Sequence, residues 1–353
     1  MKYLVTILII IVLAAGGTYF FFLNKPEGKV NFVSVNSNFS LSSAAGLISF
    51  VSNRDGNDEI YLTDSSGLFF KRITNTAERE YGPKLSLSSN QIAFFSQSSD
   101  YTGIYLFSLS TEEKRLLNIT RGFPRSLKIS PDDRRLAFLE DFSSKKATGD
   151  LYLVDLQTGK VERVASEVQD YNWSSDSNNI IYAIKDPLAS ITDTKLLFRT
   201  IDEKGTLLDE IELFKGGVAP IYLMTSKKII FLDVKGEFLQ LISMTLRGEN
   251  QKELFTIRIR PQENSSYFMD VNSANNEVLL NIYSDQLLIE SLIVSLEEQS
   301  VKKLELEANN LEWGSGEAIV YTTEDQSNNS QIWFREGPNS ESYQITKEMN
   351  NWF

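Results

Sequence analysis

Short apolar runs recur along this chain at nearly constant spacing, and apolar residues alternate with polar ones within them. The run 48–50 (ISF) has six later counterparts, and successive first residues are 44, 44, 44, 49, 49 and 41 positions apart. The counterparts begin at Ile92, Leu136, Ile180, Ile229, Val278 and Ile319. Such alternation of β-branched and aromatic residues with polar ones is typical of half-buried strands, and long helical periodicity is absent after Leu23. The pattern predicts an all-β chain built from a repeat of about 45 residues.

Each copy of the repeat contains four runs in the same order. In the first copy, residues 59–62 (EIYL) and then 71–74 (KRIT) follow the initial run, and a fourth run, such as residues 127–129 (LKI), precedes the next copy. Residues 130–133 (SPDD) and 174–177 (SSDS) are tight-turn sequences, because proline presets φ and Asp or Ser side chains bond nearby main-chain amides. Each copy is therefore predicted to form a four-stranded antiparallel meander.

A single sheet of this kind cannot bury both of its faces, whereas several sheets arranged radially can. The sequence therefore predicts an all-β fold, a β-propeller of four-stranded antiparallel blades over residues 30–353. Seven copies predict seven blades, and the divergent middle copies leave six or eight as alternatives. Residues 30–45 are predicted to supply the first strand of blade one, and residues 351–353 the start of another strand. Both ends of the chain would then meet in one closing blade, which removes the exposed sheet edge.

Two stretches resemble a known repeat family. Residues 48–61 (ISFVSNRDGNDEIY), followed by residues 71–74 and Pro83, are similar to the WD40-like β-propeller repeat of the TolB family. Residues 130–138 (SPDDRRLAF) resemble the Ser-Pro-Asp-Gly hairpin of the same family. The resemblance is specific in the first three copies, faint in the fifth and sixth, and recovers in the seventh. It implies a bacterial extracytoplasmic propeller.

The N-terminal segment is strongly apolar. Tyr3 to Leu23 is a stretch of 21 residues without a charge, and polar, helix-breaking residues 24–29 follow it. At 1.5 Å per residue such a helix would be about 31 Å long, enough to cross the hydrocarbon core of a membrane. Residues 1–29 are therefore interpreted as a signal anchor, with one transmembrane helix and a short linker, preceding the propeller. The alternative is a cleaved signal peptide processed within residues 14–17, but residues 18–23 stay apolar where a mature N-terminus is usually polar.

Composition restricts the possible chemistry. The 353 residues include no histidine and no cysteine, which excludes Ser–His–Asp triads, thiol nucleophiles, disulfides and metal sites with imidazole or thiolate ligands. There are 35 basic and 47 acidic residues, a net charge of −12. Because phosphate contacts require clustered Lys and Arg, this balance argues against nucleic-acid binding.

Carboxylates are the main catalytic candidates that remain. The adjacent pairs at 112–113, 132–133 and 297–298 do not fit a glycosidase, whose two carboxyls face each other across a sugar, because neighbours on a strand point to opposite faces. The acidic loop 53–59 lacks the twelve-residue spacing and terminal Glu of an EF-hand. The sequence predicts no catalytic residue, no metal ligand and no cofactor, and leaves open a calcium ion in the propeller channel.

The best binding candidates lie in two kinds of loop. The resemblance implies that loops before the fourth run reach the mouth of the central channel, and an inter-strand loop of the first copy joins them. Arginine and aromatic residues are typical of binding hot spots. The candidate channel-mouth residues are Arg54, Asp55, Asp58, Tyr81, Arg121, Phe123, Arg125, Asp170 and Tyr171.

These observations together predict a membrane-anchored, extracytoplasmic propeller in the cell envelope, periplasmic or at the cell surface. It would act as a monomeric ring that binds a protein or peptide partner or serves as a scaffold, held at the membrane through residues 3–23. A cleaved, secreted form is the alternative location. The alternative function is a propeller that binds envelope glycan or cleaves it with carboxylates, as a glycoside hydrolase or lyase would.

Overall fold

The computed structural model describes most of the chain from residue 46 onward. The described ranges are 46–141, 148–185, 194–223, 226–259, 265–272, 276–284, 287–314, 316–324 and 330–346, together with the main chain of three short strands, β1 (Ile10–Ala14), β2 (Gly17–Phe21) and β3 (Phe39–Leu41). All regular secondary structure in these residues is β.

Five sheets contain four antiparallel strands each, and neighbours in the sheet are neighbours in the chain. We call them blades 1, 2, 5, 6 and 7. Blade 1 is β3, β4 (Leu47–Ser52), β5 (Glu59–Asp64) and β6 (Phe70–Arg72); blade 2 is β7 (Arg79–Leu85), β8 (Gln91–Gln97), β9 (Thr102–Ser108) and β10 (Lys114–Thr120). Blade 5 is β18 (Val218–Leu223), β19 (Lys228–Lys235), β20 (Phe238–Thr245) and β21 (Lys252–Arg258). Blade 6 is β22 (Ser265–Asn272), β23 (Glu277–Ser284), β24 (Leu287–Ser295) and β25 (Ser300–Lys303). Blade 7 is β26 (Asn310–Trp313), β27 (Ile319–Glu324), β28 (Ser330–Arg335) and β29 (Ser342–Gln344).

One further sheet has seven strands because a single long strand belongs to two blades. Its strands are β11 (Phe123–Ile129), β12 (Arg135–Asp141), β13 (Gly149–Asp155), β14 (Val161–Trp173), β15 (Asn179–Lys185), β16 (Thr194–Ile201) and β17 (Leu207–Lys215). The first part of β14, from Val161 to Val168, pairs with β13, and the part from Val168 to Trp173 pairs with β15. The sheet therefore comprises blade 3 (β11 to early β14) and blade 4 (late β14 to β17).

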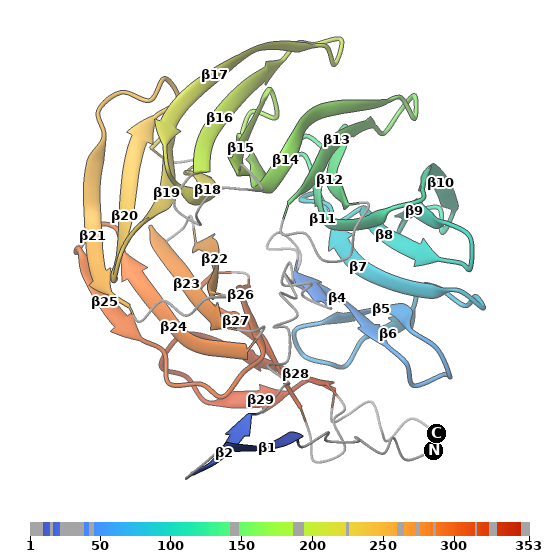
Figure 1. Cartoon of the computed structure of the whole chain (residues 1–353). Helices are drawn as coiled ribbons and strands as arrows, with labels where there is room; N and C mark the ends of the chain where they lie inside the picture. The colour runs from blue at the N-terminus through green and yellow to red at the C-terminus, as the bar shows by residue number, and fades with distance from the viewer. Residues whose placement is uncertain are drawn as a thin grey trace.

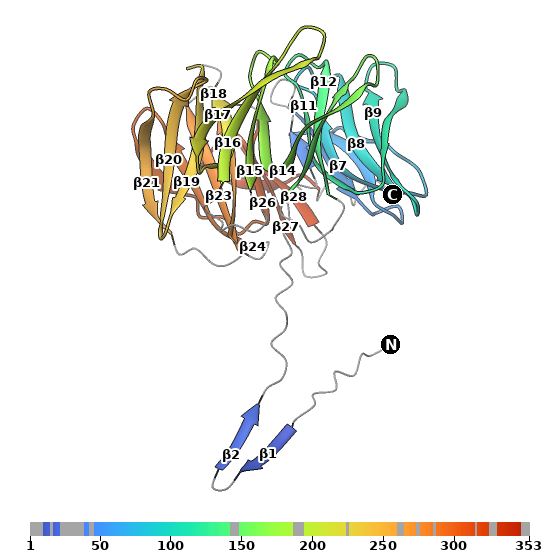
Figure 2. The same cartoon turned by 45° about the horizontal axis from the view of Figure 1, so that its top comes forward.

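The blades surround a common centre. Figure 1 shows them as a ring in which first strands such as β18, β22 and β26 lie innermost and fourth strands such as β21 and β25 lie outside. Figure 2 shows the same sheets from another direction, standing beside one another as separate layers. The predicted four-stranded antiparallel meander is confirmed, and each of the seven recurring runs that begin at Ile48 forms the second strand of a blade.

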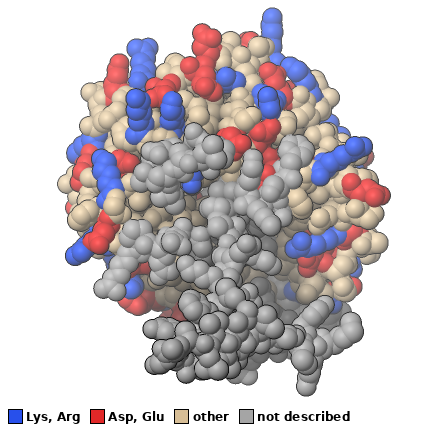
Figure 3. Space-filling model, in the orientation of Figure 1, with Lys and Arg blue, Asp and Glu red and all other residues tan. Residues whose placement is uncertain are grey.

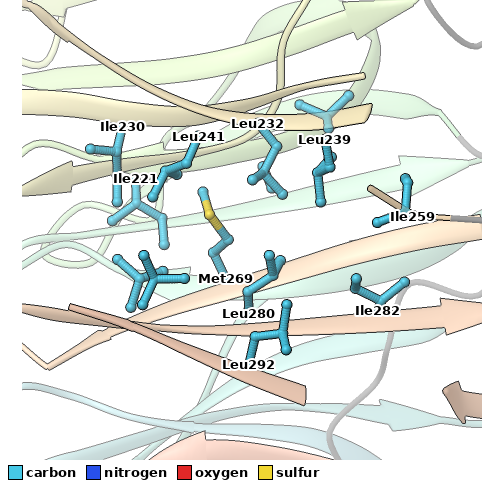
Figure 4. Close-up of a cluster of buried hydrophobic side chains, with 14 of the residues drawn as sticks. Ile221, Ile230, Leu232, Leu239, Leu241, Ile259, Met269, Leu280, Ile282 and Leu292 are labelled. Atoms are coloured by element: carbon cyan, nitrogen blue, oxygen red, sulfur yellow. The ribbon is translucent and has the colours of Figure 1, made fainter. Parts of the chain in front are cut away.

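Apolar side chains fill the space between every pair of adjacent blades. Seven clusters of buried residues occur in the described part of the chain, and each joins two neighbouring blades. Figure 4 shows the one between blades 5 and 6, where Leu232 and Leu241 lie across from Leu280 and Leu292. Each sheet buries both faces in this way, so the ring needs no second layer.

The predicted tight turns follow a shared geometry at the ends of the first strands of blades 3 and 4. The hydroxyl of Ser130 donates to Asp132 Oδ1 at 2.7 Å, and Ser174 makes the same bond to Asp176 at 2.5 Å. The third residue after each serine has a positive φ, 57° at Asp133 and 61° at Ser177, which short polar residues tolerate best. The side-chain bond inside the turn explains why Ser and Asp recur there.

Among the described residues, no blade combines strands from both ends of the chain. All four strands of blade 7 come from residues 310–344, and all four of blade 1 come from residues 39–72. The fourth described strand of blade 7 is its own β29, which pairs with β28. Residues 39–41 do form the first strand of blade 1, as expected; residues 30–38, 42–45 and 351–353 lie outside the described residues.

Side-chain packing closes the ring instead. We call the interface between blades 7 and 1 the seam; its cluster includes Phe50 and Tyr61 from blade 1 and Val320 and Ile345 from blade 7. Gly67 in a turn of blade 1 lies directly against blade 7: a Cβ atom there would be 3.0 Å from the carbonyl oxygen of Ile345. In the described residues, the seam is thus a close contact in which no strand of blade 7 pairs with a strand of blade 1.

The transmembrane helix predicted over residues 3–23 falls mostly on residues outside the described ones. The residues described within it form an antiparallel hairpin, in which Ile10 pairs with Phe21 and Ala14 with Gly17. The rest of residues 1–29 lies outside the described residues. Among the described residues, no helix is long and apolar enough to cross a membrane.

The seam can be tested by removing one of its side chains. Ile345 is 1% exposed, so Ile345→Ala should leave a cavity and lower the free energy of unfolding by about 2–5 kcal/mol. Leu68→Ala, at a residue of blade 1 that is 77% exposed, should change it by less than about 0.5 kcal/mol. Urea denaturation of both variants gives the measurement. Equal effects of the two substitutions would show that packing at the seam is not important for stability.

Candidate binding site

The two ends of the ring differ in which loops they carry. Each first strand begins beside the end of the second strand of its blade, as the pairs Arg79 with Gln97 and Phe123 with Asp141 show. We call this end of the ring face A. The opposite end, which carries the turns after the first strands, including Leu87 and Asp132, is face B. By this topology the loop between β4 and β5 belongs to face A.

Arg54 lies in that loop and stacks on aromatic rings of blade 1. Its guanidinium carbon is 5.0 Å from the ring centroid of Tyr61 and 4.7 Å from that of Phe70, distances typical of cation–π contacts. Burial lowers the pKa of Arg54. The next residue, Asp55, accepts the hydroxyl of Tyr61 at 2.5 Å and pairs with Arg72 at 3.0 Å. These contacts fix the loop on blade 1.

The same loop is also bonded to blade 2. Asp58 Oδ2 pairs with Arg79 Nε at 2.7 Å, and the main-chain oxygen of Asp58 accepts the amide of Glu80 at 2.9 Å. Asn57 donates its side-chain amide to the carbonyl oxygen of Thr76 at 3.1 Å. The loop therefore bridges two blades on face A.

Tyr81 continues this chain of contacts toward blade 3. Arg79 lies 5.6 Å from its ring centroid, Phe95 packs against the ring at 5.0 Å, and the hydroxyl donates to the carbonyl oxygen of Pro124 at 3.3 Å. Burial raises the pKa of Tyr81 to about 12. Tyr81 thus acts in positioning the strands of blades 2 and 3 rather than as an exposed contact.

Three further candidates lie on blade 3 or just before it. Arg121 is exposed in the turn before β11, and Phe123, the first residue of β11, is 50% exposed. Arg125 is half-buried, and this burial lowers its pKa while the charge of Asp141 acts in the opposite direction. Of these three candidates, Arg121 and Phe123 are the most accessible.

The last two candidates do not join this surface. Asp170 Oδ1 lies 3.6 Å from Lys128 Nζ. Tyr171 is fully buried in the cluster between blades 3 and 4, and its hydroxyl donates to the carbonyl oxygen of Ala137 at 2.7 Å. The interpretation of Tyr171 as a channel-mouth contact is therefore wrong: it was expected in a loop before a fourth run, but it lies inside β14 with its side chain buried.

Charged side chains of both signs surround the ring. Figure 3 shows Lys and Arg interspersed with Asp and Glu around the rim of the visible face. Ion pairs such as Arg72 with Glu59 at 3.0 Å and Arg163 with Asp150 at 3.2 Å neutralise part of this charge locally. The accessible part of face A on blades 1 to 3 is therefore mixed in sign, with arginine and aromatic groups held in place by acidic partners.

Sequence reasoning missed a buried pair of carboxyl groups next to the loop between β4 and β5. Glu59 begins β5 and Glu80 lies in β7, and both are 0% exposed. Glu59 Oε1 accepts from Arg72 at 3.0 Å and from the amide of Thr76 at 2.9 Å. Glu80 Oε1 accepts the hydroxyls of Thr76 at 2.6 Å and of Ser96 at 2.9 Å.

The second carboxyl oxygens of Glu59 and Glu80 have a different hydrogen-bonding environment. Glu59 Oε2 and Glu80 Oε2 are buried without any partner outside the pair in the described residues, and the two carboxyls hydrogen-bond to each other. Burial raises the pKa of Glu80 to about 7, and the charge of Glu59 adds to this. Burial alone would also raise the pKa of Glu59, but hydrogen bonds from Thr74, Thr76 and Arg72 hold it below its usual value. The pair therefore retains one proton near neutrality, and Glu80 carries it.

The proton on Glu80 makes stability depend on pH. The unfolded chain releases this proton near its ordinary pKa of 4.5, whereas the folded chain keeps it up to about pH 7. Stability should therefore fall as pH rises from about 4.5 to about 7 and then level off. Glu80→Gln preserves the bonds and removes the titration, so it should raise the free energy of unfolding at pH 8 by about 2–4 kcal/mol and change it little at pH 4.5.

Urea denaturation at pH 4.5, 6 and 8 measures this effect. Glu113→Gln, at an exposed position of the same blade, is the control and should follow the unmodified chain at each pH. If Glu80→Gln keeps the full pH dependence of the unmodified chain, the shared proton is not present.

Sequence comparisons identify no relative for this chain: no family model matches it, and no curated protein does. Solved structures do match it. An oligogalacturonate lyase in complex with manganese aligns with a TM-score of 0.63 and 12% identity, over 85% of this chain and 89% of that one. The β-propeller domain of the Trilobed protease from Pyrococcus furiosus aligns with a TM-score of 0.63 and 13% identity, over 90% and 97%. TolB from Acinetobacter baumannii aligns with a TM-score of 0.50 and 15% identity, over 74% and 63%.

These similarities show that the chain has a β-propeller fold. Structural likeness to TolB agrees with the repeat that the sequence resembles, although the identity is low. The matched proteins include a lyase, a protease domain and TolB, so the fold alone does not define an activity.

Proposed function

We propose that this chain is a seven-bladed, TolB-like propeller that binds a protein or peptide of the cell envelope through face A of blades 1 to 3. In this proposal it is a binding or scaffold protein rather than an enzyme, and it works as a monomeric ring. Residues 3–23 hold it at the membrane, with the propeller outside the cytoplasm.

The supporting observation is the arginine–aromatic surface on face A. Arg54, Arg79 and Phe123 are accessible there, and acidic partners or aromatic rings fix both arginines before any partner arrives. Side chains that are already ordered lose less entropy on binding, and arginine and aromatic residues dominate interface hot spots. Such a surface suits a partner of mixed polarity better than a polyanion.

Carboxylate chemistry is less well supported on this surface. The carboxylates of Asp55 and Asp58 are already paired with Arg72 and Arg79. Glu80 retains a proton but is fully buried, so it has no access to a substrate. Binding is therefore the function that the described side chains of face A favour.

Site-specific photo-crosslinking in cells tests the proposal. A photoreactive phenylalanine analogue at Phe123 should crosslink to one discrete envelope protein, because this residue is 50% exposed on face A. The same analogue at Leu87, which is 45% exposed on face B, is the matched control and should not. Arg54→Ala in the Phe123 background should reduce the crosslinked band by about tenfold if the arginine is a hot spot, since that corresponds to about 1.4 kcal/mol.

Three results would contradict the proposal. They are equal crosslinking from both positions, no crosslink from Phe123, and a band that Arg54→Ala leaves unchanged. Release of soluble sugar from purified envelope glycan by the purified chain would favour the alternative function, glycan cleavage.

A further inference from the structure

Two acidic side chains meet on the innermost strands of blades 6 and 7. Asp270 lies in β22, and its Oδ2 accepts the main-chain amide of Trp313 in β26 at 2.8 Å. Its Oδ1 accepts the amide of Val271 at 2.9 Å. Glu312 is the residue immediately before Trp313, and its charge acts on the carboxyl group of Asp270.

Glu312 is buried without a counter-ion. It is 7% exposed, and its carboxylate makes no hydrogen bond or ion pair with any residue in the described part of the chain. A buried ionised carboxylate is costly unless a cation or donor compensates it. The hydroxyl of Tyr283 is also buried and unpartnered among the described residues. Burial and then the charge of Glu312 raise the pKa of Tyr283, so this hydroxyl lies within electrostatic reach of the carboxylate.

The charges that reach Asp270 come from three elements. Burial raises its pKa to about 6, and the charge of Glu312 on β26 acts in the same direction. The amides of Trp313 and Val271 and the charge of Lys84 on β7 lower it. Lys84 is the only basic group among these influences, and it forms no ion pair in the described residues. The local charge near neutral pH is therefore negative.

We propose that Asp270 and Glu312 form a binding site for an organic cation, an ammonium or guanidinium group. This proposal rests on the proposed function, because such a group would be a basic side chain or the N-terminal amine of the bound protein or peptide. Glu312 would form the ion pair that it lacks within the chain, and Tyr283 would supply a nearby hydroxyl.

An organic cation fits these donors better than a metal ion does. Calcium takes six to eight oxygen ligands, whereas both oxygens of Asp270 already accept main-chain amides. The described residues contain no group of three or more acidic side chains positioned to hold a metal. An ammonium or guanidinium needs only one or two carboxylates in hydrogen-bond reach.

Saturation-transfer NMR on the purified full chain tests the site with small cations. Butylammonium and butylguanidinium represent lysine and arginine side chains, glycinamide represents a chain N-terminus, and 1-butanol is the neutral control. Saturable binding of at least one cation, without binding of butanol, is expected at pH 8. The cation bound most tightly identifies the source. Absence of saturable binding by all three cations would overturn the proposal.

Charge-neutral variants assign the binding to these residues. Glu312→Gln should weaken binding by about tenfold or more, because it removes the unpaired charge. Glu305→Gln removes one charge at an exposed position of the connection leading to β26 and should change binding by less than about twofold. Equal losses in the two variants would indicate only a general effect of net charge and would overturn the site.

Lys84→Met provides a test that does not weaken the acidic pair. Removing this positive charge should raise the affinity for the cation, and an unchanged or lower affinity would contradict the site. Binding should also be weaker at pH 5 than at pH 8, because Asp270 becomes protonated below about pH 6. Displacement of the organic cation by 1 mM CaCl2 in the unmodified chain would make a divalent metal the ligand and overturn the assignment.

This experiment and the crosslinking experiment can fail separately. Cation binding without a crosslink at Phe123 would retain the cation site and remove the proposed partner surface on face A. A crosslink without cation binding would do the reverse.

Discussion

Closure of the ring depends on side-chain packing between blades 7 and 1, because each of these blades obtains all four strands from its own end of the chain. Every other pair of adjacent blades is also linked directly by the main chain, as the connection from β6 to β7 shows. At the seam, Phe50 and Tyr61 of blade 1 meet Val320 and Ile345 of blade 7 in one cluster. The inner strands keep their positions only while this contact remains closed. The placement of the face A loops relative to Asp270 and Glu312 therefore depends on it.

Polar groups shape the candidate binding surface on face A, and they are organised around blade 1. Tyr61 belongs to the seam cluster, and its hydroxyl also holds Asp55 below Arg54. On the same strand as Tyr61, Glu59 lies beside Glu80 of blade 2, and its charge helps to raise the pKa of Glu80. A buried polar pair of this kind stabilises less than an apolar contact of equal size, but it fixes one arrangement of the neighbouring loops. Tyr61 thus takes part both in the packing that closes the ring and in the candidate binding surface.

Local pattern was sufficient to predict the strands but not their long-range partners. The runs at Ile48, Ile92 and Leu136 alternate clearly, and the turns at Ser130 and Ser174 carry their own side-chain bonds, so both were predictable. The shared strand β14 was not, because nothing between Val164 and Tyr171 shows that the main chain stays extended from one blade into the next. Glu59 and Glu80 are 21 positions apart, and only the contact between blades makes them a pair. Asp270 and Glu312 lie in or beside copies whose repeat pattern is faint, where the positions facing the centre cannot be identified from sequence.

The shared strand β14 has a mechanical consequence. It makes blades 3 and 4 one continuous hydrogen-bonded sheet, on the side of the ring away from the seam (Figure 1). A force or a ligand that widened the ring would therefore meet unequal resistance around its circumference. Blades 3 and 4 are joined by the continuous main chain of β14, whereas blades 7 and 1 are held together by apolar packing and by a hydrogen bond from the Tyr343 hydroxyl to the carbonyl oxygen of Ser65 at 3.0 Å. In the described part of the chain no strand is shared across the seam, so a widening of the ring would begin between blades 7 and 1.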